Sequence, residues 1–177
     1  MFMEKKVTIF GSSRAKPESH TYKLAYELGK LLADAGFIVC NGGYMGIMEA
    51  SLRGAKESGG KTIGVTTQAF QERAPNSWID EEIKTNGYVE RLDRLIHIAD
   101  AFVVLKGGIG TLSELSLVWT LIAIGEIKKP VILIGDEWHK AIDSLKKNLV
   151  IDYHETQALV TLKKPKDAVE FLKRLPL

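Results

Sequence analysis

Cysteine is almost missing from this 177-residue sequence, and the single one, Cys40, excludes an internal disulfide framework. Cys40 lies in an apolar stretch, so we expect a small core residue there rather than a nucleophile. Long hydrophobic runs are missing as well, and neither a membrane span nor a signal peptide is expected. The net charge is only +2, which gives no electrostatic reason to expect binding to nucleic acid or to a membrane surface. We therefore expect a cytoplasmic protein without those two partners.

Two common nucleotide-binding motifs are also absent, since the chain contains neither G-x-G-x-x-G nor G-x-x-x-x-G-K-[ST]. The histidines share no spacing of the kind that metal ligation needs, so no metal site is expected. What is present is an ordinary globular composition, with 45% hydrophobic and 26% charged residues. The length favours one domain over residues 1–177.

Strand-like and helix-like segments alternate along the chain. Such alternation predicts an α/β fold, namely a doubly wound, mostly parallel sheet with helices on both faces, as in Rossmann-like proteins. The acidic residues 80–82 are expected in a solvated loop. Short apolar or β-branched stretches predict strands over residues 6–10, 37–40, 62–65, 83–85, 101–105, 131–134 and 158–162. Apolar residues at helical spacing predict helices between Pro17 and Gly36 and over residues 47–57, 88–99, 111–124, 138–149 and 165–174.

Residues 101–114 carry the main functional signal. A buried strand is followed by three glycines, Gly107, Gly108 and Gly110, which allow a ligand to approach the backbone closely. A helix is expected to start at Gly110 or Thr111, and its free N–H groups and positive dipole end would point into this turn. We therefore predict that Gly107, Gly108, Gly110 and Thr111 bind a phosphate.

Glu114 lies about one helical turn beyond that loop and has two interpretations. A carboxylate at this position could reach a sugar whose phosphate the loop holds. Thr111 and Glu114 also fit a capping box, in which both side chains only satisfy free amides at the start of the helix. The glycine loop after a buried strand favours the ligand site.

Two further loops of small residues follow expected strands, one after Phe10 and one after Cys40. The carboxyl ends of parallel strands meet at one edge of a sheet, so we expect all three loops to converge on one ligand. Tyr44 and Met45 could line a pocket for a base or pack in the core. The residues predicted to bind substrate are Gly11, Ser12, Ser13, Gly42, Gly43, Met45 and Gly46.

The helix expected over residues 111–124 is apolar nearly all round. A helix of this kind is buried either in the core or in a subunit interface. We therefore expect a homodimer, with this helix at or near the contact.

Residues 107–114, with the sequence G-G-I-G-T-L-S-E, resemble the P-G-G-x-G-T-x-x-E motif of the Lonely Guy (LOG) family after its leading proline. These proteins are cytokinin riboside 5′-monophosphate phosphoribohydrolases, once labelled lysine decarboxylases. Residues 10–13 are similar to the family's F-C-G-S-S, residues 41–50 to its Y-G-G-G-x-x-G-L-M-G, and residues 63–65 to its I-G-V. Arg91 falls where the family has the arginine of its M-H-x-R-K segment.

The resemblance implies hydrolysis of the N-glycosidic bond of a nucleoside 5′-monophosphate, giving free base and ribose 5-phosphate. It implies that Glu114 and Arg91 are catalytic. Glu114 would stabilise an oxocarbenium-like state, orient water or bind ribose hydroxyls, and Arg91 would face the phosphate or the departing base. The partner would be a nucleoside monophosphate or a similar phosphorylated small molecule. The resemblance also points to a homodimer and to chemistry without a metal or an organic cofactor.

Three departures from the family's pattern involve four residues. Lys106 stands in place of the motif's proline, Leu92 replaces the lysine after the family's arginine, and Tyr88-Val89 replaces Met-His. The alternative function is therefore a non-catalytic carrier or sensor of a phosphorylated ligand, resembling the molybdenum-cofactor carrier proteins. The retained pair of catalytic residues favours the enzyme, and the first two departures favour the carrier.

Overall fold

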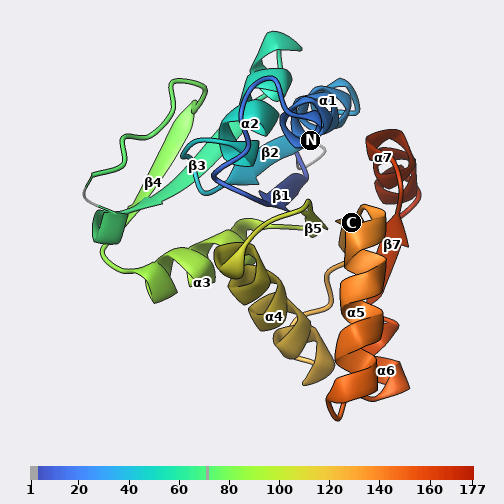
Figure 1. Cartoon of the computed structure of the whole chain (residues 1–177). Coiled ribbons are helices and arrows are strands. Elements are labelled where there is room, and N and C mark those ends of the chain that lie inside the picture. Colours follow the sequence, from blue (N-terminus) through green and yellow to red (C-terminus); the bar gives the residue numbers. More distant parts are fainter. Residues whose placement is uncertain (1–3, 71) are drawn as a thin grey trace.

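A parallel sheet of seven strands runs through the computed structural model, which describes residues 4–70 and 72–177 (Figure 1). All neighbouring pairs are parallel, in the order β4-β3-β2-β1-β5-β6-β7. The predicted doubly wound α/β fold is confirmed. The strands are β1 (Lys6–Phe10), β2 (Ile38–Asn41), β3 (Thr62–Thr67), β4 (Glu81–Thr85), β5 (Ala101–Val104), β6 (Val131–Ile134) and β7 (Leu159–Leu162). The helices of the described residues are α1 (His20–Asp34), α2 (Ile47–Glu57), the short 3-10 helix η1 (Gln68–Phe70), α3 (Tyr88–Ile98), α4 (Ile109–Ala123), α5 (Asp136–Asn148), α6 (Tyr153–Thr156) and α7 (Pro165–Lys173).

Two helical layers cover the sheet. α1, α2 and α7 pack on one face, and α3, α4 and α5 pack on the other (Figure 1). Successive side chains of a strand point to opposite faces, so Ile9 packs under the first layer while its neighbour Phe10 packs under the second. There Phe10 stacks on Phe102, with ring centroids 5.7 Å apart. The central strands are therefore apolar on both faces, as expected for a parallel sheet covered on both sides.

The direction of winding reverses between β1 and β5. The chain winds away from β1 through β2, β3 and β4, then returns to β5 on the other side of β1 and continues through β6 and β7. Phe10 pairs with Val104, so the loops that leave these two strands start side by side. An opening at such a reversal, beyond the carboxyl ends of the strands, is where sheets of this type bind ligands.

The acidic residues 80–82 are expected from their charge to lie in a solvated loop, and Asp80 does lie in an exposed bend before β4. Glu81 and Glu82 instead belong to β4, so the expectation is wrong for these two residues. β4 pairs with β3 on one side and is an edge strand, where charged side chains can reach solvent. The carboxylate of Glu82 also accepts a hydrogen bond from the hydroxyl of Thr66 at 2.7 Å. The sequence does not predict η1 and α6, because these helices are too short to show a period.

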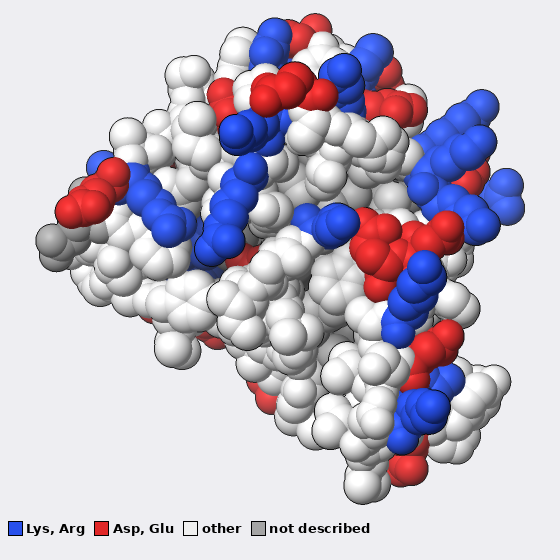
Figure 2. Space-filling view, viewed as in Figure 1, with Lys and Arg blue, Asp and Glu red and all other residues white. Residues whose placement is uncertain are grey.

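α4 is more exposed than its apolar composition predicts. Its buried residues are Thr111, Leu115 and Val118, whereas Ile109 is 82% exposed and Ile124, just beyond its end, is 67% exposed. Figure 2 shows a largely uncharged surface over this helix. Burial in the chain's own core, one of the two expected reasons for the composition, is therefore confirmed for the side of α4 that carries Leu115 and Val118. A subunit interface stays a prediction for the exposed side. Within the described residues, no helix is both long enough and apolar enough to cross a membrane.

Candidate functional site

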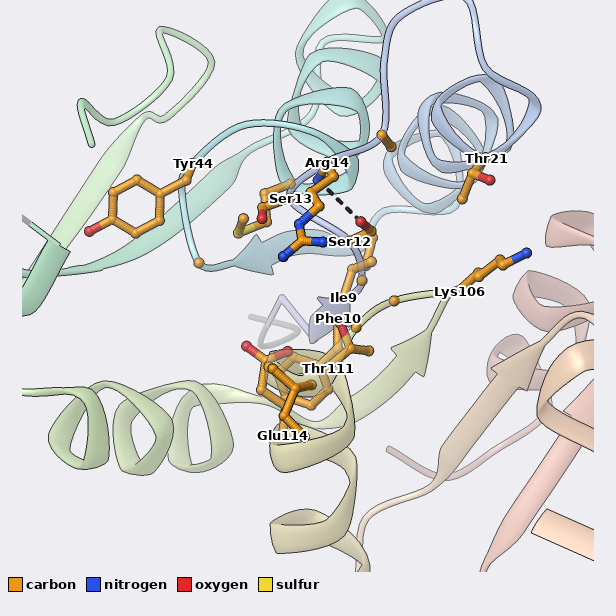
Figure 3. A pocket seen from close by; sticks show the side chains of 18 of the residues that line it. Ile9, Phe10, Ser12, Ser13, Arg14, Thr21, Tyr44, Lys106, Thr111 and Glu114 are labelled. Carbon is orange, nitrogen blue, oxygen red and sulfur yellow. Dashed lines mark hydrogen bonds between the residues drawn. The ribbon is translucent and has the colours of Figure 1, made fainter. Parts of the chain in front are cut away.

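A cavity of about 1050 Å³ opens at the carboxyl edge of the sheet, where the loops after β1, β2 and β5 come together as predicted (Figure 3). Figure 3 shows Thr111 and Glu114 on the first turns of α4, Arg14 extending toward them from the opposite wall, and Lys106 pointing away from them. The predicted site residues that line the cavity are Gly11, Ser12, Ser13, Gly42, Arg91, Gly107, Gly108, Gly110, Thr111 and Glu114.

The backbone of Ser12 holds the three loops in one arrangement. Its N–H donates to the carbonyl of Lys106 at 3.2 Å, and its carbonyl accepts from the N–H of Ile47 at 2.9 Å. The first bond joins the loop after β1 to the glycine loop after β5, and the second joins it to the start of α2. Gly46 permits this close approach, because it has a φ of +71° and a Cβ there would collide with the backbone of Ser12.

Three residues predicted to bind substrate lie outside the cavity lining, namely Gly43, Met45 and Gly46. The two glycines have φ of +74° and +71°, so the turn itself requires them. The side chain of Met45 is exposed, with 54% of its surface accessible. Tyr44 lines the cavity and is also buried, with its hydroxyl hydrogen-bonded to the backbone of Thr67. The position of Tyr44 is therefore compatible with both expected roles, lining a pocket for a base and packing in the core.

The amino end of α4 presents backbone donors to the cavity. The helix begins at Ile109, slightly earlier than predicted, so Gly110 and Thr111 belong to its first turn. Gly108 is the N-cap residue, and no side chain caps this end, so the capping-box interpretation of Thr111 is not observed. No described residue accepts a hydrogen bond from the amides of Ile109, Gly110 or Thr111. Free amides and the positive end of a helix dipole together form a typical anion site.

Two alanine substitutions in this loop are expected to separate folding from binding. A Cβ at Gly107 would collide with the side chain of Thr111, so Gly107→Ala should destabilise the protein by about 1–3 kcal/mol. A Cβ at Gly108 meets no atom within 4 Å, and the φ of −105° suits any residue. Gly108→Ala should therefore fold normally while obstructing a phosphate at the amides. Chemical denaturation and phosphate binding, measured on both variants, check this; unchanged phosphate binding by Gly108→Ala would count against the loop as an anion site.

Glu114 and Arg91 form an ion pair in the cavity wall, although they come from different helices. Nη1 of Arg91 lies 3.7 Å from Oε1 of Glu114, and their side chains are only 4% and 12% exposed. Burial raises the pKa of Glu114 to about 7, and the positive charge of Arg91 opposes that increase. Burial lowers the pKa of Arg91, and the negative charge of Glu114 opposes that decrease. A carboxyl group that titrates near neutral pH beside a cavity is typical of catalytic acids and bases.

Several contacts fix the position of Arg91. Its Nε donates to the carbonyl of Val65 at 2.8 Å, and its Nη2 lies 3.9 Å from the sulfur of Met48. A Cβ on Gly42 would collide with Nη2, so the second glycine loop makes room for the guanidinium. The next residue, Leu92, is buried in the core. The lysine that follows the arginine in the family's pattern therefore has no charged counterpart here.

Several cavity residues carry no signal in the sequence that predicts a role in the site. Arg14 and Lys16 follow the first loop without belonging to a motif, and Phe70 and Arg73 come from the irregular segment between β3 and β4. Basic side chains outnumber acidic ones around the cavity, which favours an anionic ligand. The basic ones are Arg14, Lys16, Arg73, Arg91 and Lys106, and the acidic ones are Glu18 and Glu114.

Cys40 is fully buried in β2, and burial raises the pKa of its thiol to about 12. A thiol with so high a pKa stays protonated at neutral pH and is a poor nucleophile. The predicted role of Cys40 as a core residue is confirmed.

Sequence comparison relates the chain to known proteins along most of its length. Residues 4–169 match the model of the SLOG cluster4 family. An Archaeoglobus fulgidus protein described as uncharacterized is 31% identical over 131 residues, which are 73% of this chain and 84% of that protein. The cytokinin riboside 5′-monophosphate phosphoribohydrolase of Mycobacterium tuberculosis is 37% identical over 119 residues, which are 66% of this chain and 63% of the enzyme. The chain thus matches less than two thirds of that enzyme's length.

Comparison of structures leads to a second group of proteins. The molybdenum cofactor binding protein of Rippkaea orientalis is similar with a TM-score of 0.79, at 25% sequence identity, over 98% of both chains. The named relatives therefore include a phosphoribohydrolase, found through sequence, and a cofactor-binding protein, found through structure.

Proposed function

The chain belongs to the SLOG cluster4 family, and on that premise we propose that it hydrolyses the N-glycosidic bond of a nucleoside 5′-monophosphate, releasing free base and ribose 5-phosphate. The observation that carries the proposal is the buried pair of Glu114 and Arg91 beside the uncapped amino end of α4. One part of the cavity can hold a phosphate, and the other offers a carboxylate within about a helical turn of it. The similarity to the phosphoribohydrolase of M. tuberculosis supports this reading.

The phosphate is bound by the loop after β5. The amides of Ile109, Gly110 and Thr111 and the hydroxyl of Thr111 supply donors, and the helix dipole stabilises the negative charge. Arg14 extends into the same space from the opposite wall and adds a positive charge (Figure 3). This arrangement fixes one end of the substrate and so sets the distance from the sugar to Glu114.

Bond cleavage takes place beside Glu114. As the base departs with the bonding electrons, positive charge develops on the anomeric carbon and the ring oxygen, and an ionised carboxylate stabilises it. The same carboxylate then orients the water that attacks the anomeric carbon and accepts its proton, and that proton passes to the departed base, so the free base forms and Glu114 becomes ionised again. The ionised form is therefore the active one. Arg91 keeps more of Glu114 ionised than burial alone would allow, because its positive charge lowers the pKa of that carboxyl.

Incubation of the purified protein with AMP, GMP, IMP, CMP and UMP, followed by chromatography of the free bases, tests the proposal. We expect base release from at least one of the five. Binding of a monophosphate without release of base from any of them would contradict the proposal and favour a carrier.

A carrier or sensor of a phosphorylated ligand is the second candidate, and two observations favour it. The similarity to the R. orientalis cofactor-binding protein extends over 98% of both chains. The cavity, at about 1050 Å³, also lies just above the ~300–1,000 Å³ range of small-molecule sites, so it admits ligands larger than a mononucleotide. The buried Glu114 has no evident task in a carrier, which is why the hydrolase is preferred.

Dependence on the 5′-phosphate is a further prediction. Each charge-assisted hydrogen bond to the phosphate contributes about 1.5–3 kcal/mol, so a nucleoside should bind at least roughly tenfold more weakly than its monophosphate. Isothermal titration of the adenosine/AMP and inosine/IMP pairs checks this. Equal affinity within both pairs would refute phosphate binding at the start of α4.

The exposed apolar side of α4 predicts a homodimer. Ile109, Leu112 and Ile124 lie on or next to this helix and are 82%, 39% and 67% exposed, and a second subunit would cover such residues. Light scattering at micromolar concentration should give twice the mass of the chain or a multiple of that value. A mass equal to that of one chain at this concentration would contradict the predicted homodimer.

A further inference from the structure

We infer that Tyr44 is a positioning residue of the proposed site, which holds the guanidinium of Arg91 beside the carboxylate of Glu114. The inference rests on the proposed function, because it names a residue that this function needs. It comes from a series of contacts that starts at the backbone of Thr67, runs through the ring of Tyr44 to Arg91, and ends at Glu114.

The hydroxyl of Tyr44 fixes its ring at the end of β3. It accepts a hydrogen bond from the N–H of Thr67 at 2.9 Å and donates one to the carbonyl of the same residue at 3.2 Å. The backbone of Tyr44 is fixed as well, because its carbonyl accepts a hydrogen bond from the side chain of Asn76 at 2.7 Å. The whole residue is only 2% exposed. A buried ring that is held at both ends is a rigid support for its neighbours.

Arg91 lies against this ring. Its Cζ is 5.6 Å from the ring centroid of Tyr44 and 5.7 Å from that of Phe70. Both distances are within about 6 Å, the range in which an aromatic ring attracts a cation. The attraction is strongest for a cation that is shielded from water, and the side chain of Arg91 is only 4% exposed. Phe70 is half-buried and has no polar side-chain atom to anchor it, so Tyr44 is the fixed partner.

The ion pair does not fix its own geometry. Nη1 of Arg91 lies 3.7 Å from Oε1 of Glu114, which is too long for a hydrogen bond. The guanidinium donates from Nε to the carbonyl of Val65 at 2.8 Å, and its Nη2 makes only a weak contact with the sulfur of Met48 at 3.9 Å. One strong hydrogen bond leaves the group able to turn about that bond. The ring of Tyr44 supplies the second support that keeps Nη1 toward Glu114.

The ionisation of Glu114 depends on where this guanidinium is held. Burial raises the pKa of Glu114 to about 7, and Arg91 is the only charged group among the described residues that lowers it. Burial lowers the pKa of Arg91, Glu114 opposes that decrease, and the other titratable groups that act on Arg91 are Tyr44, Tyr88 and Arg73. The two tyrosines are uncharged at neutral pH, and Arg73 repels Arg91. Movement of Arg91 away from Glu114 would therefore raise the pKa of that carboxyl further.

Two substitutions of Tyr44 separate the ring from its anchor. Tyr44→Leu removes the ring, so we expect the acid limb of kcat/KM to move to higher pH and kcat/KM at pH 7 to fall about tenfold. Tyr44→Phe keeps the ring but loses the bonds to Thr67, so its limb should move in the same direction by less. The measurement is kcat/KM between pH 6 and pH 9, with the pKa of the Glu114 carboxyl followed separately by carbon NMR.

The effect of Tyr44 should disappear once Arg91 has been replaced. Tyr44→Leu combined with Arg91→Met should give the acid limb of Arg91→Met alone, because Tyr44 acts through the guanidinium. Tyr22→Leu is the matched control, since Tyr22 is buried on α1, at 4% exposed, and lies outside the cavity lining. It should lose stability without moving the acid limb.

An acid limb that stays at the wild-type position in Tyr44→Leu, or in Tyr44→Phe where the leucine variant does not fold, would overturn the inference. A raised KM with an unmoved limb would also overturn it, because the ring would then act only on the substrate. A shift of equal size in the Arg91→Met background would do the same. If the wild type releases no base, the hydrolase is contradicted and the NMR titration decides the inference: a raised pKa of Glu114 in the Tyr44 variants supports it, and an unchanged pKa overturns it.

Discussion

Replacing Glu114 by glutamine is expected to lower kcat by roughly a hundredfold or more while leaving nucleotide binding nearly intact. Glutamine keeps the size of the side chain but cannot carry the negative charge that stabilises an oxocarbenium-like state. In the proposed mode of binding the phosphate contacts come from the start of α4, so affinity should change little. Thermal stability should also change little, because glutamine removes the cost of a buried carboxylate while Arg91 loses its partner. Steady-state kinetics of the variant check the fall in kcat, isothermal titration checks the nucleotide affinity, and thermal melting checks the stability.

The wild-type protein should show the same carboxylate in its pH profile. The pKa of Glu114 is raised from 4.5 to about 7, so the active, ionised form predominates above pH 7 and is lost as the pH falls. Below pH 7, kcat/KM should fall about tenfold for each pH unit, whereas an ordinary glutamate would hold its activity down to about pH 4.5. Glu126→Gln is the matched control, because Glu126 is exposed just beyond α4. A flat profile down to pH 5, or turnover by Glu114→Gln close to the wild type, would contradict the catalytic role.

Removal of the charge of Arg91 should also lower kcat/KM strongly. Arg91→Met fills much of the same buried space, yet it leaves Glu114 without a cation and loses the hydrogen bond to Val65. The pKa of Glu114 should rise above about 7, because the positive charge that lowers it is gone. We expect kcat/KM at pH 7 to fall by roughly a hundredfold, with the acid limb of the pH profile moved to higher pH. The measurement is kcat/KM between pH 6 and pH 9.

Arg91→Lys is the companion variant, since it keeps a charge near Glu114 without the planar geometry of arginine. The acid limb of its pH profile should lie closer to the wild-type limb than the acid limb of Arg91→Met does. An unmoved acid limb in Arg91→Met would show that the two side chains are not coupled as their 3.7 Å separation indicates.

The fold and the positions of the glycine loops could be predicted because their signals are local. Buried parallel strands appear as short apolar runs, and the glycines of the loops after β1, β2 and β5 mark places where the backbone turns or a ligand approaches. Glu114 and Arg91 could be singled out by the resemblance to a known motif. Their pairing could not, because they lie 23 positions apart on separate helices and only the packing of α3 and α4 brings them to 3.7 Å.

The segment between β3 and β4 and the exposure of α4 could not be predicted, for a different reason. Phe70 and Arg73 belong to a segment with no period, and its position is fixed by tertiary contacts such as the hydrogen bond from the side chain of Asn76 to the carbonyl of Tyr44, at 2.7 Å. No pattern in the local sequence predicts such contacts. For α4, composition reveals how apolar the helix is but not which of its sides the rest of the chain covers.

The most direct test of the central claim is the product balance of the wild type and of Glu114→Gln with one nucleoside 5′-monophosphate at pH 8, where Glu114 is ionised. Free base and ribose 5-phosphate are quantified in the same samples over time. The account predicts that the wild type forms both products in equal amounts over many turnovers, and that Glu114→Gln forms them at least roughly a hundredfold more slowly while still binding the nucleotide. Formation of neither product by the wild type, or equal rates in the two proteins, would contradict it.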